Sequence, residues 1–573
     1  MRRLLAPARL RRLIRQNEIA LTALAACIGL VAGGAVMGLQ AVIHLMGHWI
    51  FGASGYLSAS ETLEPLRAFG GPVIGGALMA LSYYFGPRWF GRIADPIEAN
   101  AIAGGKMNLA GSLFLSGQTV VSSGFGASVG MEAAYTQVTS ALASLSGQRL
   151  RLRREDMRLL VAAAAGAAIA AAFNAPLAGA FYAFELVLAG YSAAAVLPVL
   201  AATLSATAIA RLLGGNTGGW LFYAGDVPAK AYPALIVIAL TAAALGILLM
   251  CSVSWAERAM RKTRLPGWSH PLLGGVLVGL LALESPQVLS SGHGAMDVVL
   301  AIPFPVETLL WLLGLKMLAS VISLGSGFRG GLFFASLLLG ALLGKSVGAL
   351  WITTFDMQLP VIIFAIVGMC AWATAVIGAP MAMSFLALEL TQSLPLALSV
   401  LFSALVASAI VRQFFGFSFS TWRFHLRGEA IRSAADVGWL RDLTVGRLMR
   451  RSIVCLPATM TVGEARRRFA LGSTKAVPLV DDTKTYRGLC ALTDLHAEAL
   501  DPKTPLADIA IHTNAWLLPA QNVQDAIRVL SRHEADMLAV LGPDRDVLGI
   551  VNEQYCLKRY AEEMNKRLYP VRR

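Results

Sequence analysis

The stretch from Ile19 to Phe415 consists of strongly apolar segments that recur one after another. A helix needs about 20 apolar residues to cross a bilayer, and several of these segments are longer or shorter than that. In the whole chain of 573 residues, 56% are hydrophobic and only 14% are charged, against roughly 25% in soluble domains. A water-soluble fold could not bury so much apolar surface, so we predict an all-α polytopic membrane domain.

Basic residues gather in the short polar connections between these segments. Residues 1–17, 149–158 and 258–264 are rich in arginine. Short basic loops stay in the cytoplasm, which predicts a multi-pass membrane protein with both termini cytoplasmic. The net charge of +14 is thereby explained by topology, and too few aromatic residues accompany it to suggest nucleic-acid binding.

Glycine-rich breaks interrupt the apolar segments at 104–105, 124–130 and 325–331. A broken helix is tolerated in a membrane only where its freed backbone faces protein or a water-filled cavity. Such breaks occur at the binding sites of transporters, near the middle of the bilayer. Two of these glycine runs lead into helices, and helix N-termini attract anions through free N–H groups. The breaks therefore predict an anion site.

An internal repeat supports a transporter architecture. Residues 174–186 read NAPLAGAFYAFEL, and residues 378–390 read GAPMAMSFLALEL. Both begin a helix with proline in the first turn and end near a glutamate, Glu185 or Glu389. Two halves that carry the same unit predict two inverted repeats with broken helices. Each glutamate is interpreted either as a structural pairing group or, for Glu185, as part of a proton pathway.

The sequence after residue 422 is polar and is organised differently. We predict a linker at 423–441, two similar α/β units at 442–500 and 501–562, and a basic tail at 563–573. Each unit has an LPA triplet, an amphipathic helix, a short strand, a turn and a second apolar strand. This order resembles tandem CBS domains.

Residues 18–422 resemble the CLC family of anion channels and transporters. Residues 173–185, FNAPLAGAFYAFE, match the family's FNAPLAG segment, and PQVLSSGHGAM at 286–296 matches a loop that reads P-x-V-L-x-x-G-Y-G. Residues 130–134, GMEAA, stand where the family has G-(K/R)-E-G-P. Residues 331–335, GLFFA, stand where it has G-x-F-x-P.

The resemblance implies an anion-binding site and a gate. The expected anion-binding residues are Gly91, Gly130, Met131, Gly331, Leu332, Phe333, Phe334 and Ser420. Gly91 falls at the family's serine and Ser420 at its inner tyrosine, so the central site would depend on backbone N–H groups and chloride selectivity does not follow. Glu132 is the expected gate, which blocks when ionised and opens when protonated; the alternative is a simple helix cap.

The resemblance leaves the transport mode open. Some family members carry a glutamate directly after the position of Glu185, whereas this chain has Leu186, which favours a channel or a weakly coupled carrier. The expected function is movement of chloride or a similar small anion, with a proton-coupled antiporter as the alternative. A carrier for another anion and a CBS-regulated cation transporter also remain open. No motif of an enzyme or metal site is found, so neither is expected.

Partners and ligands follow from the same resemblance. We expect a homodimer in the lipid bilayer, with the transported anion as the only small ligand. CBS domains of some relatives bind adenine nucleotides through G-x-x-T-x-x-D. Here the first unit keeps Gly488 and Asp494 but has Ala491, and the second has Tyr555 in place of the aspartate. ATP or AMP is therefore expected to bind weakly or not at all.

Overall fold

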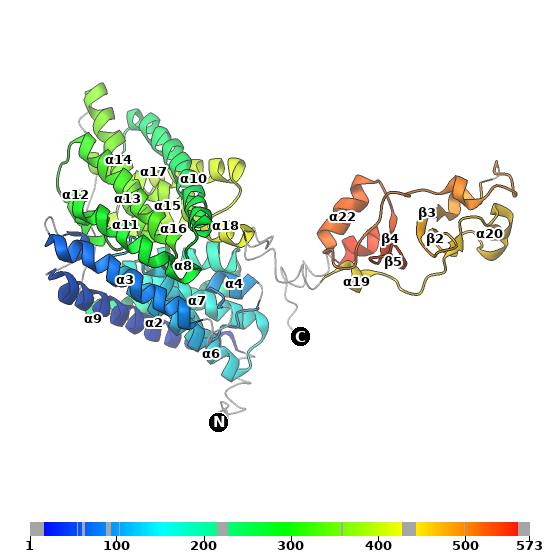
Figure 1. Cartoon of the computed structure of the whole chain (residues 1–573), viewed down its shortest axis with the longest axis horizontal. Coiled ribbons are helices and arrows are strands. Elements are labelled where there is room, and N and C mark those ends of the chain that lie inside the picture. The colour runs from blue at the N-terminus through cyan, green and yellow to red at the C-terminus, as the bar shows by residue number, and fades with distance from the viewer. Residues whose placement is uncertain are drawn as a thin grey trace. The chain divides into compact units, whose positions relative to one another are not determined.

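The computed structural model describes residues 17–53, 56–59, 63–86, 93–101, 103–214, 227–356, 359–426, 443–497 and 499–559. The chain divides into two compact units, Met1–Ala435 and Asp436–Arg573. The described part of the first unit is helical throughout, and the second combines short helices with strands (Figure 1). This confirms the predicted fold class of a helical membrane domain followed by an α/β unit.

The first half of the membrane unit contains eight α-helices in its described residues. They are α2 (Glu18–Met46), α3 (Pro65–Phe85), α4 (Pro96–Ala101), α5 (Leu109–Gly124), α6 (Glu132–Leu150), α7 (Arg154–Phe173), α8 (Pro176–Tyr182) and α9 (Ala193–Gly214). The short π-helical segment η1 (Gly47–Phe51) extends α2, and a second one, η4 (Ala183–Leu188), extends α8.

The second half contains nine α-helices in its described residues. They are α10 (Tyr232–Lys262), α11 (His270–Glu284), α12 (His293–Ala301), α13 (Val306–Ser326), α14 (Phe333–Phe355), α15 (Val361–Ile377), α16 (Pro380–Thr391), α17 (Leu394–Phe414) and α18 (Phe419–Leu426). Helix α18 continues past Arg423, so the first residues of the predicted linker are helical.

Eight helical segments among the described residues are long and apolar enough to cross a membrane, and three apolar helical segments are shorter. They differ in how deeply they are buried. In α7 and α14, 83% of the most apolar window is buried, against 39% in the segments that contain α2 and α3. Helices α7 and α14 therefore form the centre of the unit, and α2 and α3 contribute to its outer surface.

The two halves repeat the same packing. Helix α7 contacts the helix before it in the chain, α6, and the two after it, α8 and α9. Helix α15 contacts the corresponding helices α14, α16 and α17. Helices α8 and α16, which carry the repeated sequence, also contact each other. Each begins with proline, at Pro176 and Pro380, as predicted. The internal repeat of the sequence thus corresponds to a repeat of structure.

Glycines allow the central helices to approach closely. A Cβ atom at Gly344 of α14 would lie 2.0 Å from the carbonyl oxygen of Phe364 in α15, and one at Gly368 would lie 2.3 Å from that of Gly340. In a membrane, helices associate through such small-residue contacts because lipid offers little hydrophobic driving force. The glycines therefore bring the backbones of α14 and α15 together.

The second unit contains two similar α/β repeats. The first has α19 (Val445–Leu448), β1 (Leu456–Pro457), α20 (Val462–Arg468), β2 (Ala476–Val480), β3 (Tyr486–Ala491) and α21 (Leu492–Leu495). The second has η8 (Leu506–Ile509), α22 (Val523–Arg532), β4 (Met537–Leu541) and β5 (Val547–Asn552). Strand β2 pairs parallel with β1 and antiparallel with β3, while β4 pairs antiparallel with β5.

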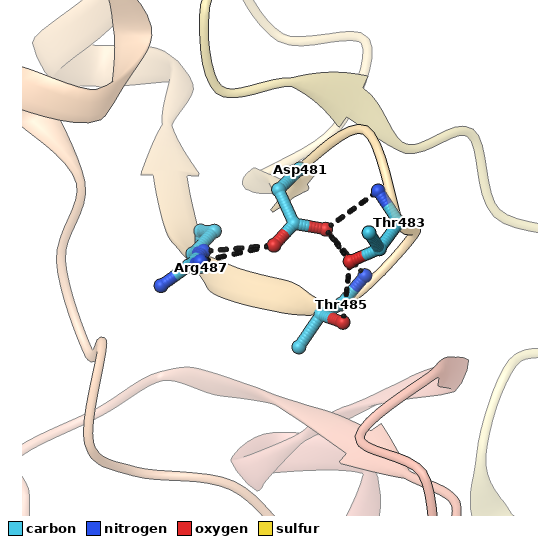
Figure 2. Close-up of polar contacts among 4 residues, drawn as sticks. All are labelled: Asp481, Thr483, Thr485 and Arg487. Carbon is cyan, nitrogen blue, oxygen red and sulfur yellow. Dashed lines mark hydrogen bonds and ion pairs between the residues drawn. The ribbon is translucent and has the colours of Figure 1, made fainter.

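The turn between β2 and β3 is closed by one carboxylate (Figure 2). Asp481 accepts hydrogen bonds from the Thr483 hydroxyl (2.6 Å), the Thr483 N–H (3.0 Å) and the Thr485 N–H (2.9 Å). Arg487 adds an ion pair at 3.0 Å. These contacts hold the pKa of Asp481 below its ordinary value of 3.8, chiefly through the Thr483 hydroxyl and the Thr485 N–H. The turn therefore depends on an ionised Asp481.

Candidate functional site

The two predicted anion-binding helices are joined at their starts. Gly130 and Gly331 form an antiparallel bridge, with N–H to O distances of 2.8 Å from Gly130 to Gly331 and 3.1 Å in reverse. Helix α6 begins at Glu132 and α14 begins at Phe333, two residues after each bridging glycine. The glycine runs of the two halves thus place two helix N-termini side by side, where free N–H groups favour negative charge.

Glu132 is the first residue of α6 and is buried, with 4% of its surface exposed. The backbone N–H groups of Glu132 itself and of Phe334 face its carboxylate and interact favourably with its ionised form. The Oε2 oxygen contacts no hydrogen-bond donor among the described residues. A Cβ atom at Gly130 would lie 2.1 Å from this oxygen. The carboxylate is therefore folded back over Gly130, onto the N–H groups that would otherwise bind an anion.

A cavity of about 870 Å³ reaches this carboxylate. Glu132, Gly331, Leu332 and Phe333 form part of its wall, and Ser420 of α18 lines it as well. Leu186 contributes an apolar surface. The cavity therefore brings together residues that lie almost 300 positions apart in the chain, and the ionisable gate candidate is part of its lining.

The other predicted anion-binding residues are placed differently. Met131 and Phe334 are buried, and neither they nor Gly130 belong to the described lining of the cavity. Phe334 reaches the site through its backbone N–H, and its ring stacks on His293 with a centroid distance of 3.5 Å. Gly91 lies outside the described residues. The predicted set is thus divided between residues that line the cavity and residues that support the helix starts.

Glu185 and Glu389 exchange hydrogen bonds between the two halves. Glu389 accepts from the N–H groups of Leu177 and Ala178 at 2.8 and 2.9 Å. Glu185 accepts from those of Met381 and Ala382 at 3.1 and 3.0 Å. The end of each helix therefore lies at the start of the other, which makes α8 and α16 antiparallel. This geometry favours the structural interpretation that the sequence left open beside a proton pathway for Glu185.

Four charged residues of the cavity were not identified from the sequence. Asp95, Glu98 and Arg329 line it together with Arg423 of α18. Asp95 accepts a hydrogen bond from the N–H of Glu98 at 2.8 Å and so caps α4. A charged residue beside an apolar segment first suggests membrane topology, so only the folded chain reveals that these side chains reach the cavity.

The residues considered for nucleotide binding lie in short elements of the second unit. Asp494 lies in α21 and accepts a hydrogen bond from the Thr493 hydroxyl at 3.3 Å. Burial, with a contribution from the charge of Asp494, raises the pKa of the nearby Cys490 thiol to about 11. Tyr555 is 48% exposed. The prediction that ATP or AMP binds weakly or not at all stays untested.

Taken together, the membrane helices, the joined N-termini and the cavity define an integral, multi-spanning membrane protein of the ion-transport class. A family model described as "Voltage gated chloride channel" matches residues 74–412, and one described as "CBS domain" matches residues 445–501. The chain belongs to the voltage-gated chloride channel family, the CLC family, and carries a C-terminal CBS domain. The resemblance to the CLC family and the presence of a CBS domain are thereby confirmed, and the second CBS unit stays a prediction.

Individual relatives agree with this assignment. A putative chloride channel protein described as ClcB-like, from Ralstonia nicotianae, is 31% identical over 400 residues, covering 68% of this chain and 93% of the relative. A slow cyanobacterial Cl⁻/H⁺ antiporter has the same fold, with a TM-score of 0.62 at 24% identity, covering 71% of this chain and 98% of that one. A eukaryotic CLC transporter has a TM-score of 0.60 at 17% identity, covering 95% and 98%.

Proposed function

We propose that the chain moves chloride or a similar small anion across the membrane and that the Glu132 carboxylate is the gate. The observation that supports this most is the position of that carboxylate, on the N–H groups where α6 and α14 begin and at the wall of the cavity. An anion and an ionised Glu132 would compete for these groups. No covalent chemistry is needed, so we propose a channel or carrier and not an enzyme.

Chloride efflux from liposomes tests the transport itself. Purified protein in vesicles loaded with KCl should release chloride when valinomycin allows potassium to leave. Empty vesicles provide the background rate, and vesicles with protein but without valinomycin show whether efflux is electrogenic. Release of potassium without chloride, in vesicles that contain the protein but no valinomycin, would contradict the proposal and favour a cation transporter.

A second mode, proton-coupled exchange, is favoured by the fold that this chain shares with a Cl⁻/H⁺ antiporter. Against strong coupling, Leu186 presents an apolar side chain to the cavity, and both oxygens of the neighbouring Glu185 already accept backbone hydrogen bonds. We therefore propose weak or absent coupling. A chloride gradient imposed on vesicles with an internal pH indicator should move few protons per chloride. Transport of protons against their own gradient, at a fixed ratio of protons to chloride, would refute this.

We further propose a homodimer with one pathway in each subunit. Helices α9 and α17 expose large apolar side chains that suit either lipid or a second copy. These are Leu197, Leu204, Leu212, Leu394, Leu398 and Leu405. Mass photometry in detergent should give twice the protein mass of 60.7 kDa. A monomer that retains full transport would refute the dimer.

The proposed membrane is a bacterial inner membrane with both termini in the cytoplasm, because the arginine-rich connections at 149–158 and 258–264 favour that side. We propose that residues 501–562 form a second CBS domain, since they repeat the order of elements in the first. The pair would regulate the membrane unit. A C-terminal reporter that is active only in the periplasm should stay inactive if this topology holds.

A further inference from the structure

Arg329 is held at the wall of the cavity by its backbone and by an aromatic ring. It lies in the glycine run before α14, and its backbone N–H donates to the Ser122 hydroxyl of α5 at 3.0 Å. Its guanidinium carbon lies 5.5 Å from the centroid of the Tyr83 ring. The Tyr83 hydroxyl in turn donates to the carbonyl of Gly327 at 2.8 Å. The position of this positive charge is therefore well defined.

The two arginines of the cavity differ in their partners. Among the described residues no ion pair involves Arg329, and its buried Nε atom has no hydrogen-bond acceptor. The other arginine that lines the cavity, Arg423, pairs with Glu257 at 3.7 Å. A partly buried guanidinium without a counter-ion carries a desolvation cost. The Arg329 guanidinium therefore lacks an ion-pair partner among the described residues, and an anion is the natural partner for it.

The remaining charges of the cavity make this contribution more important. Asp95, Glu98 and Glu132 are all part of its described lining. Asp95 also covers the start of α4, because it accepts the hydrogen bond from the Glu98 N–H. Three carboxylates would repel an entering anion. An anion that nevertheless enters needs a compensating positive group, and Arg329 is the cavity arginine without an ion pair in the described part of the chain.

We propose that Arg329 binds the transported anion directly, before the anion reaches the helix starts beside Glu132, and that it favours planar oxyanions over chloride. This inference rests on the proposed transport function and names a ligand and a substrate class for it. A guanidinium presents N–H donors in a plane that match two oxygens of a planar anion, whereas a spherical halide uses them less well. Nitrate is the simplest monovalent probe of this geometry.

Equilibrium binding and flux of the full-length protein test the role of Arg329. Calorimetry in detergent should show tighter binding of nitrate than of chloride to the native chain. Arg329→Gln should weaken nitrate binding by about tenfold to a hundredfold, the usual effect of losing hydrogen bonds to a charged group, and chloride binding by less. Arg329→Lys keeps the charge without the planar donor set. It should keep chloride binding but lose the preference for nitrate.

Arg258→Gln is the matched control, because Arg258 is exposed on α10 and is not part of the described cavity lining. It removes the same charge and should leave both affinities unchanged. Unchanged nitrate and chloride affinities in Arg329→Gln would overturn the inference while liposome flux still supports anion transport. A native chain that neither binds nor transports either anion would instead overturn the proposed function. Arg329→Lys serves the same test if Arg329→Gln does not fold.

Discussion

Carboxylates stand at helix starts in two regions of the membrane unit, and they are held very differently. In the contact between α8 and α16, each oxygen of Glu185 and Glu389 accepts a hydrogen bond from a backbone N–H of the other half. At the joined starts of α6 and α14, Glu132 Oε2 has no donor among the described residues. A carboxylate whose oxygens are all bonded fastens two elements, whereas one that is half bonded can leave at a smaller cost.

The difference lies in where each carboxylate comes from. Glu185 and Glu389 reach helix starts of the opposite half, so their release would separate the two repeats. Glu132 covers the start of its own helix and of its neighbour α14, so its release would uncover N–H groups without separating any helices. The same interaction of a negative charge with a helix N-terminus can therefore serve as a fastener or as a plug.

The largest effect is expected from removing the negative charge of the Glu132 carboxylate. Glu132→Gln mimics the protonated side chain, and Glu132→Ala removes it. Native transport should rise as the pH falls through the pKa of this carboxyl group, because the protonated form releases the N–H groups. Both variants should give chloride efflux that is at least about tenfold faster at neutral pH, the effect of ~1.4 kcal/mol, and that no longer responds to pH.

Chloride efflux at several pH values, with the native chain in parallel, checks this prediction. Any proton coupling of the native chain should vanish in both variants. If Glu132→Gln leaves the rate and its pH dependence unchanged, Glu132 is only a helix cap, and the two regions do not differ in the way described.

A second, smaller effect is expected when the Glu132 carboxylate is displaced by a neighbouring side chain and not removed. A Cβ atom at Gly130 would lie 2.1 Å from Glu132 Oε2, so Gly130→Ala should push the carboxylate outward and reduce the pH dependence of efflux severalfold. Gly331→Ala is the matched variant, because its Cβ atom would lie 3.7 Å from the same oxygen, an ordinary contact. Equal effects of both substitutions would show that the bridge matters more than the carboxylate.

Removing the Glu185 or Glu389 carboxylate from the contact between α8 and α16 should lower stability and leave anion selectivity unchanged. Glu389→Ala removes two hydrogen bonds to a charged group, which should lower the free energy of unfolding by about 3 kcal/mol. Glu185→Ala should do the same from the other half. The apparent Tm in detergent measures the change, and Glu284→Ala, at the exposed end of α11, is the control. A stable Glu389→Ala protein with altered anion selectivity would contradict the comparison.

The smallest effect is expected at Asp481. This carboxylate also accepts several hydrogen bonds, but it lies in the β2–β3 turn of the second unit and is partly exposed to water. Because its pKa lies below 3.8 in the folded chain, its contribution is complete above that value and is lost as the pH falls through the folded pKa. Asp481→Ala should speed hydrogen exchange of the Thr483 and Thr485 amides at neutral pH. Asp482→Ala should not, since Asp482 makes none of these contacts. Unchanged exchange in both variants would contradict the role of Asp481.

Local patterns in the sequence predicted where these helices begin. Proline at 176 and 380 and the glycine runs before 132 and 333 each correspond to an observed helix start. The short strand predicted in each of the two C-terminal units is also observed, as β2 and β4, because short apolar runs between helices and turns leave a clear local signal. Features that depend on neighbouring residues could thus be derived from the chain alone.

Features that depend on distant partners could not be derived in this way. The sequence indicates that Glu185 and Glu389 are equivalent, but only the packing of α8 on α16 shows that each binds the other's helix. The bridge between Gly130 and Gly331 leaves no local trace, since any glycine run is compatible with many partners. Arg329 was missed for the same reason, because its lack of an ion pair is a property of the assembled cavity.

The bridge between Gly130 and Gly331 can form only late in the synthesis of the chain. Gly331 leaves the ribosome about 200 residues after Gly130, which corresponds to ~10–40 s of translation at the usual speed. Throughout that interval the start of α6 lacks its partner Gly331, and a membrane tolerates unpaired backbone only where protein or water covers it. Until α14 is made, the half-made protein therefore needs other protein or water to cover the start of α6.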